Sequence, residues 1–178
     1  MQIEQTLFAD IKIINNFYSK DSRGSFTKIF NEANYSEQGI DMEIKEVFYS
    51  YSDCNVIRGM HFQIPPYDHN KLVHVVSGAI IDVIVDLRKN SSNYGKSVGI
   101  PISSSDNKAI YVPSGFAHGF RTLVDNTCVL YMVSKEYSRE HDCGIKWNSI
   151  GYDWECLDPI ISDRDKSFSN LNDYISPF

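Results

Sequence analysis

Short apolar or alternating runs, separated by turn residues, extend along almost the whole chain. The runs lie at residues 11–15, 25–30, 44–52, 55–63, 71–76, 79–87, 97–102, 109–112, 115–123, 127–133 and 144–147. Strands this short at regular spacing are typical of an all-β sandwich or barrel. Ser, Gly, Asn and Asp between the runs favour tight turns. Helix is scarce, and only residues 31–38 and 162–173 are expected to form short helical turns.

The fourth run, NVIRGMHFQ, carries the most distinctive chemistry. Side chains alternate between the two faces of a strand, so we expect Arg58 and Met60 to share one face. Gly59, His61 and Gln63 would then share the other face, where a glycine close to a histidine leaves open space. The pattern therefore predicts a pocket beside His61.

Lys71 opens the next apolar run, which is placed to return alongside the first. A histidine and a lysine that face one cavity would supply a base and a cation. The alternative is a buried His61 whose ring bonds a backbone carbonyl, together with a lysine at a strand edge. Both interpretations fit this stretch when it is taken alone.

Other segments also carry candidate functional groups. Arg23 lies at the tip of the turn DSRGSF, where a guanidinium either contacts phosphate or stays a solvated charge. The string YVPSGFAHGF has enough Gly and Pro to fix a tight bend beside His118. Tyr131 lies within a β run and Tyr137 just beyond its end, although a tyrosine in a strand usually belongs to the core.

Composition excludes several classes of protein. The 178 residues suit one domain, and neither an internal repeat nor a linker between two cores is visible. The net charge of −6 argues against binding to nucleic acid or to anionic membranes. No signal peptide or membrane-spanning segment is expected, and four cysteines without a CxxC pair indicate reduced thiols.

Taken together, the strings DSRG, VIRGMHFQ, KLV, VPSGFAHGF, IKWN and SDRD resemble the dTDP-4-dehydrorhamnose 3,5-epimerase family. They occur in the family's order over nearly the whole chain. The resemblance implies one cupin-like epimerase domain over residues 1–178, an all-β, cupin-type jelly-roll β-barrel with a few short helices. It also implies a cytoplasmic homodimer whose N-terminal strands reach onto the partner.

The resemblance implies a set of catalytic residues as well. The family acts on nucleotide-linked 4-keto sugars, whose C4 ketone makes the hydrogens on C3 and C5 acidic. His61 is then the base, and Asp165 pairs with its ring and stabilises the imidazolium. Tyr131 is the acid on the opposite face, and Lys71 stabilises the enolate oxygen. No cofactor is expected, because the ketone is already the electron sink.

The same resemblance implies a set of substrate-binding residues. This set comprises Arg23, Phe26, Lys28, Glu46, Phe48, Arg58, Gln63, His118 and Tyr137. The two arginines would hold the diphosphate. His118 would line the sugar pocket, and Tyr137 would stack near the base or border the sugar.

Three of these positions depart from the commonest members of the family. Glu46 and Phe48 stand where many relatives carry Gln and Asn, and Lys28 stands where many carry Glu. If Lys28 meets the nucleobase, it suits the acceptor N3 of cytosine better than the N3–H of thymine. The nucleotide would then be CDP rather than dTDP, whereas a Lys28 that points to solvent carries no such meaning.

Several other functions remain open from the sequence. They are a mono-epimerase that inverts only C3 or only C5, a 3,4-ketoisomerase of the same fold, and a cupin that binds a sugar nucleotide without turning it over. A binding module has no need of a base, an acid and a paired carboxylate together. A metal site is not expected, because metal-binding cupins present HxH and this strand continues from His61 as Phe62 and Gln63.

Overall fold

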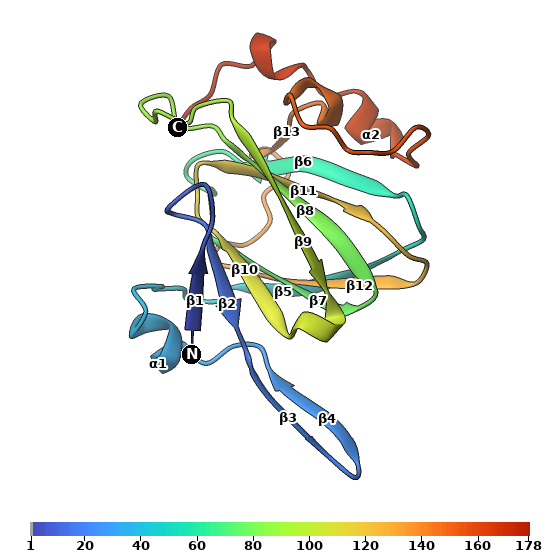
Figure 1. The fold of residues 1–178 in the computed structure, drawn as a ribbon. Coiled ribbons are helices and arrows are strands. Elements are labelled where there is room, and N and C mark those ends of the chain that lie inside the picture. Colours follow the sequence, from blue (N-terminus) through green and yellow to red (C-terminus); the bar gives the residue numbers. More distant parts are fainter. Residues whose placement is uncertain (1) are drawn as a thin grey trace.

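Two large antiparallel sheets pack face to face in the computed structural model, which describes residues 2–178 without the side chains of Gln2 and Gln5 (Figure 1). The six-stranded sheet has the order β1 (Gln2–Gln5), β2 (Lys12–Asn15), β10 (Lys108–Val112), β7 (Lys71–Ser77), β12 (Thr127–Val133), β5 (Glu46–Ser52). The five-stranded sheet has the order β13 (Asp142–Gly144), β6 (Ile57–Gln63), β11 (Phe116–Thr122), β8 (Ala79–Asp86), β9 (Ser97–Ser103). This architecture confirms the predicted all-β, cupin-type jelly roll.

The remaining elements are short. They are the hairpin β3 (Phe17–Asp21) and β4 (Gly24–Lys28), the helices α1 (Glu32–Ser36) and α2 (Asp163–Lys166), and the 3-10 turns Ser104–Asp106, Trp147–Ser149 and Leu171–Asp173. The predicted strand at 144–147 is wrong, because β13 ends at Gly144 and the chain then enters a 3-10 turn at Trp147. The strands β1 and β3 were not predicted, since neither has a continuous apolar face.

Strand β8 shows how the sheets divide the core. Its side chains alternate, so that Ile84 packs between the two sheets, whereas Val83 and Val85 face the outer side of the five-stranded sheet. That outer side is covered by the C-terminal segment, which buries Trp154 and Leu171 against it (Figure 1). This packing brings helix α2 next to strand β6.

Strand β6 departs from simple alternation beside β11. Between the pairs His61–His118 and Arg58–Phe120, β6 advances by three residues and β11 by two. The extra residue in β6 is a β-bulge, which shifts the faces by one position. Arg58 consequently lines the same cavity as His61, whereas Met60 is fully buried in the core. The prediction that Arg58 and Met60 share a face is therefore wrong.

The sequence predicted that Gly59 leaves open space beside His61. In the structure Gly59 instead allows β6 and β11 to approach each other closely. A Cβ built at this position would lie 2.6 Å from the Cα of Gly119 on β11. Its φ of +140° is also one that residues with a side chain rarely adopt. Any other residue here would push β6 and β11 apart.

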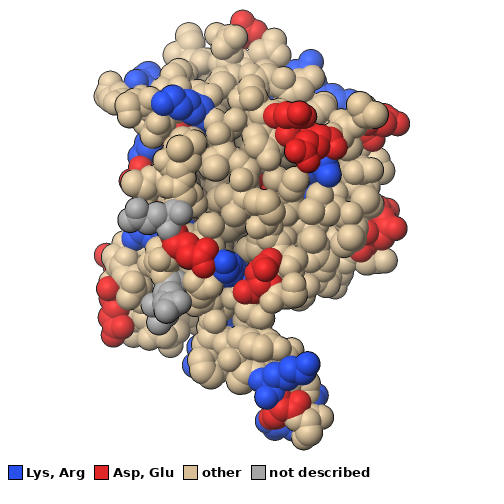
Figure 2. All heavy atoms as spheres, viewed as in Figure 1, with Lys and Arg blue, Asp and Glu red and all other residues tan. Residues whose placement is uncertain are grey.

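The hairpin of β3 and β4 projects from the body of the molecule (Figure 1). Its tip carries an ion pair between Arg23 and Asp21, with 2.6 Å between Nη2 and Oδ2, and Figure 2 shows charges of both signs there. The rings of Phe17 and Phe26 contact each other on the hairpin and remain more than half exposed. The hairpin therefore presents an apolar surface that its own chain does not cover.

Candidate active site

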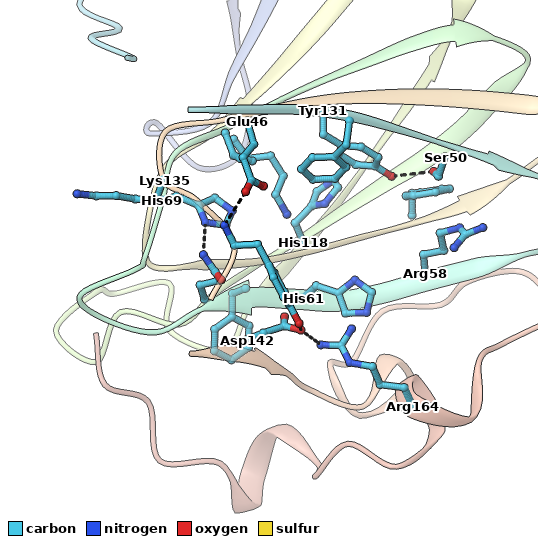
Figure 3. A pocket seen from close by; sticks show the side chains of 17 residues that line it. Glu46, Ser50, Arg58, His61, His69, His118, Tyr131, Lys135, Asp142 and Arg164 are labelled. Carbon is cyan, nitrogen blue, oxygen red and sulfur yellow. Dashed lines mark hydrogen bonds and ion pairs between the residues drawn. The ribbon is translucent and has the colours of Figure 1, made fainter. Parts of the chain in front are cut away.

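A cavity of about 350 Å³ lies between the two sheets and is lined by side chains from both (Figure 3). Its lining residues are Glu46, Phe48, Ser50, Arg58, His61, Phe62, Gln63, His69, Lys71, His118, Phe120, Tyr131, Val133, Lys135, Tyr137, Asp142 and Arg164. The cavity thus gathers most of the residues that the sequence singled out.

His61 and Asp165 form a hydrogen-bonded pair in the wall of the cavity. His61 donates its Nε2–H to Oδ1 of Asp165 at 2.8 Å, and the backbone N–H of Gly59 donates to Oδ2 at 3.1 Å. Burial alone would raise the pKa of Asp165, but these hydrogen bonds hold the pKa below its ordinary value. The ionised Asp165 fixes the ring so that Nδ1 of His61 is free to accept a proton.

Helix α2 places Asp165 for this role. Ser162 caps the helix, and its Oγ accepts the backbone N–H of Asp165 at 3.1 Å. The side chain of Asp165 is almost fully buried, whereas that of His61 is about one-third exposed, at 31%. The carboxylate is thereby shielded from water while the imidazole reaches the cavity.

Tyr131 enters the cavity from β12 in the opposite sheet. Its ring stacks on Phe48 with 4.9 Å between centroids, and its hydroxyl lies 3.4 Å from Oγ of Ser50. Burial raises the pKa of Tyr131, so the phenol keeps its proton at neutral pH. A protonated phenol therefore lies on the wall that faces the sheet of His61.

Lys71 lines the cavity from β7, which belongs to the same sheet as Tyr131. Burial lowers the pKa of Lys71 to about 8, against the opposing effect of Asp82 and Asp142. Among the described residues, no carboxylate lies close enough to form an ion pair with its Nζ. An ammonium of this kind is available to a developing oxyanion.

His118 is bound to a second buried carboxylate. Its Nε2–H donates to Oδ1 of Asp82 at 2.6 Å, and both side chains are nearly inaccessible to solvent. Burial lowers the pKa of His118 in spite of this contact. The hydrogen bond holds the ring in one orientation in the lining of the cavity.

Gln63 lines the cavity, but its polar groups are already engaged. Its Oε1 accepts the N–H of Ser138 at 2.6 Å, and its Nε2 donates to the carbonyl oxygens of Tyr67 and Glu136. Only 5% of Gln63 is exposed. Gln63 therefore holds the segment after β12, and its predicted contact with substrate stays a prediction.

The hairpin residues of the predicted substrate-binding set do not reach this cavity within one chain. Arg23, Phe26 and Lys28 lie on β3–β4 or its turn and are all exposed. Their contact with substrate stays a prediction that depends on a partner chain.

Other residues of the site were not predicted. They are Ser50, His69, Asp82, Lys135, Asp142 and Arg164. Asp82 carries the one available signal, because an aspartate in the middle of the apolar run AIIDVIVD must be paired inside the protein.

In the part of the chain that the structure describes, no three His, Cys, Asp or Glu side chains lie close enough to hold a metal ion. No helix there is long and apolar enough to span a membrane.

Known proteins resemble this chain in sequence and in fold. A protein-family model described as dTDP-4-dehydrorhamnose 3,5-epimerase matches residues 5–173. The enzyme of that name from Methanothermobacter thermautotrophicus is 41% identical over 86% of this chain and 85% of its own. The enzyme from Escherichia coli K12 is 36% identical over 98% of this chain and 97% of its own.

The crystal structure of dTDP-4-dehydrorhamnose 3,5-epimerase from Bacillus anthracis, with TDP and PPi bound, superposes with a TM-score of 0.92. It is 38% identical and covers 95% of this chain and 98% of that one. The enzyme from Sulfolobus tokodaii superposes equally well, with 31% identity and 99% of each chain covered. On this evidence the chain belongs to the dTDP-4-dehydrorhamnose 3,5-epimerase family.

Proposed function

We propose that the protein is a cofactor-independent epimerase that inverts C3 and C5 of a dTDP-linked 4-keto-6-deoxyhexose, within one cupin-like domain over residues 1–178. The observation that carries the proposal is the placement of a base and an acid on facing walls of one cavity. His61, oriented by Asp165, belongs to one sheet, and the protonated Tyr131 belongs to the other. A pure binding module would gain nothing from this arrangement.

The proposed reaction uses these groups in turn. His61 takes a proton from the carbon next to the C4 ketone, and the electron pair of the broken C–H bond moves into the carbonyl to form an enolate. Lys71 stabilises the enolate oxygen. Tyr131 then gives its proton to the same carbon from the opposite face, which inverts the centre. Proton exchange with solvent restores both residues, and the second carbon follows the same course.

Proton NMR of dTDP-4-keto-6-deoxyglucose in deuterated water tests this function. Deuterium at both C3 and C5, together with formation of the L-sugar, supports the 3,5-epimerase. Deuterium at only one of the two carbons would instead indicate a mono-epimerase. A product whose carbonyl has moved would indicate a 3,4-ketoisomerase. No label with dTDP-, CDP- or GDP-linked substrates would leave the non-catalytic cupin.

The choice of dTDP rests on the relative from Bacillus anthracis that was solved with TDP. Lys28, the residue that suggested CDP, lies on the projecting hairpin rather than in the cavity of its own chain. Calorimetric titration with dTDP and with CDP separates the two nucleotides. Tighter binding of CDP would move the proposal to a CDP-linked sugar.

We further propose that the active form is a cytoplasmic homodimer. Strand β5 is the last strand of its sheet and exposes Val47, Tyr49 and Tyr51 by 57%, 64% and 62%. An apolar sheet edge of this kind needs a cover, and the hairpin with Phe17 and Phe26 is a suitable one. The free cysteines agree with a reducing compartment. Light scattering should give the mass of two chains, and a monomeric mass would contradict the dimer.

The ionisation of Lys71 predicts the alkaline limb of the pH profile. Because its pKa is lowered to about 8, Lys71 is charged below that pH and loses its charge above it. We expect kcat/KM to fall above about pH 8, and Lys71→Met to lose about 10²-fold in rate together with this limb. Profiles of both proteins from pH 6.5 to about pH 10 check this. An unchanged alkaline limb in Lys71→Met would assign the titration to another group.

A further inference from the structure

Tyr137 is held at the cavity although it lies on an exposed segment. It is 60% accessible and follows the end of β12 by four residues. Its backbone N–H donates to Oε1 of Glu46 at 2.9 Å, and its hydroxyl donates to Oδ2 of Asp142 at 3.2 Å. The Gln63 contact to the next residue, Ser138, adds a third point of attachment. Since little packing covers Tyr137, these polar contacts determine where its ring lies.

Asp142 also contacts the opposite side of the site. The same Oδ2 accepts Nη2–H of Arg164 at 2.6 Å, and Figure 3 shows the two side chains end to end. Arg164 precedes Asp165 on α2, and its guanidinium lies 5.0 Å from the centroid of the Phe168 ring. Phe168 in turn meets the His61 ring edge to face, with 5.9 Å between centroids. One carboxylate oxygen thus joins the segment of Tyr137 to the helix that orients the base.

Strand β13 holds the backbone of Asp142 and leaves room for Phe168. Gly144, two residues further along β13, has no side chain, and a Cβ there would lie 2.2 Å from Cε2 of Phe168. Asp142 itself pairs with Gln63 across β13 and β6. Its position is therefore set by the sheet, whereas Tyr137 and Arg164 depend on its side chain.

We infer that Asp142 is a positioning residue of the epimerase, which fixes Tyr137 and the His61–Asp165 pair relative to each other through its shared oxygen. The inference rests on the proposed function for its effect on rate, but not for its effect on structure. The side chain of Asp142 is 18% exposed and that of Arg164 is 46% exposed. An ion pair that is partly open to solvent contributes little to folding stability. The loss of Asp142 should therefore appear in catalysis and in the order of the segment at 134–141, rather than in the melting temperature.

The test uses Asp142→Asn, which keeps the shape but removes the charge and one acceptor. We expect kcat to fall about tenfold, with dTDP affinity and melting temperature close to those of the unmodified protein. Asp163→Asn is the control, because Asp163 forms a solvent-exposed ion pair on α2, with Lys166 at 3.5 Å, and is not among the residues that line the cavity. It should leave kcat unchanged. Tyr137→Phe completes a double-mutant cycle, in which the two losses should not add.

Trypsin cleavage after Lys135 and Arg139 gives a readout that needs no substrate, since both residues lie on the exposed segment. Cleavage should be faster in Asp142→Asn than in Asp163→Asn. Equal cleavage of the two variants, an unchanged kcat, or additive losses in the cycle would overturn the inference. If the unmodified protein exchanges no protons with any 4-keto sugar but cleavage is still faster in Asp142→Asn, the proposed function fails and the positioning by Asp142 stands.

Discussion

Replacing His61 with asparagine is expected to reduce epimerisation by about 10³-fold or more while nucleotide binding persists. Asparagine has a similar reach but cannot accept a proton at neutral pH, so the first step loses its base. Asp165 would remain ionised, because the backbone N–H of Gly59 still donates a hydrogen bond to its Oδ2. Deuterium uptake followed by NMR measures the loss, and calorimetry with dTDP measures the binding.

Asp165→Asn provides the companion measurement. An amide keeps the hydrogen-bonding shape but cannot stabilise an imidazolium, so the loss should be smaller than that of His61→Asn. The double variant should be no slower than His61→Asn alone, because the two residues act as one unit. Deuterium uptake within tenfold of the unmodified rate in His61→Asn would show that another group is the base.

The fold was predictable because most of its strands coincide with short apolar or alternating runs in the sequence. Alternating runs such as Thr127–Val133 match an observed strand, and most others differ by one or two residues at their ends. The bulge in β6 was not predictable, since it depends on how β6 pairs with β11. A local rule of alternation therefore placed Arg58 on the wrong face, whereas the resemblance to the family named it as a site residue and it lines the cavity.

The pairs that organise the site were the hardest to predict. His61 and Asp165 are 104 positions apart, and only the family pattern connects them. His118 and Asp82 are 36 apart and meet because β8 and β11 are neighbours in the sheet. Asp142 gave no signal, because a polar residue near a turn is ordinary. A side chain that acts through another side chain can be identified only from the three-dimensional structure.

Replacing Tyr131 with phenylalanine is expected to separate proton exchange from inversion. The variant keeps the ring that stacks on Phe48 but loses the hydroxyl that faces the cavity. His61 still removes a proton and can return a deuteron to the same face. Substrate should therefore gain deuterium with its configuration retained, while formation of the inverted sugar slows by about 10³-fold.

NMR in deuterated water distinguishes these outcomes, because the coupling constants report the configuration and the lost signals report the label. Ser50→Ala is the control, since it removes the hydroxyl that lies 3.4 Å from the Tyr131 hydroxyl and should affect inversion far less. Inversion at the unmodified rate in Tyr131→Phe would place the acid elsewhere. If Tyr131→Phe loses both proton exchange and inversion, Tyr131 acts on the same face of the substrate as His61. That result would contradict the place of Tyr131 in the opposite sheet. Exchange with retention is the result that only two groups on opposite faces can give.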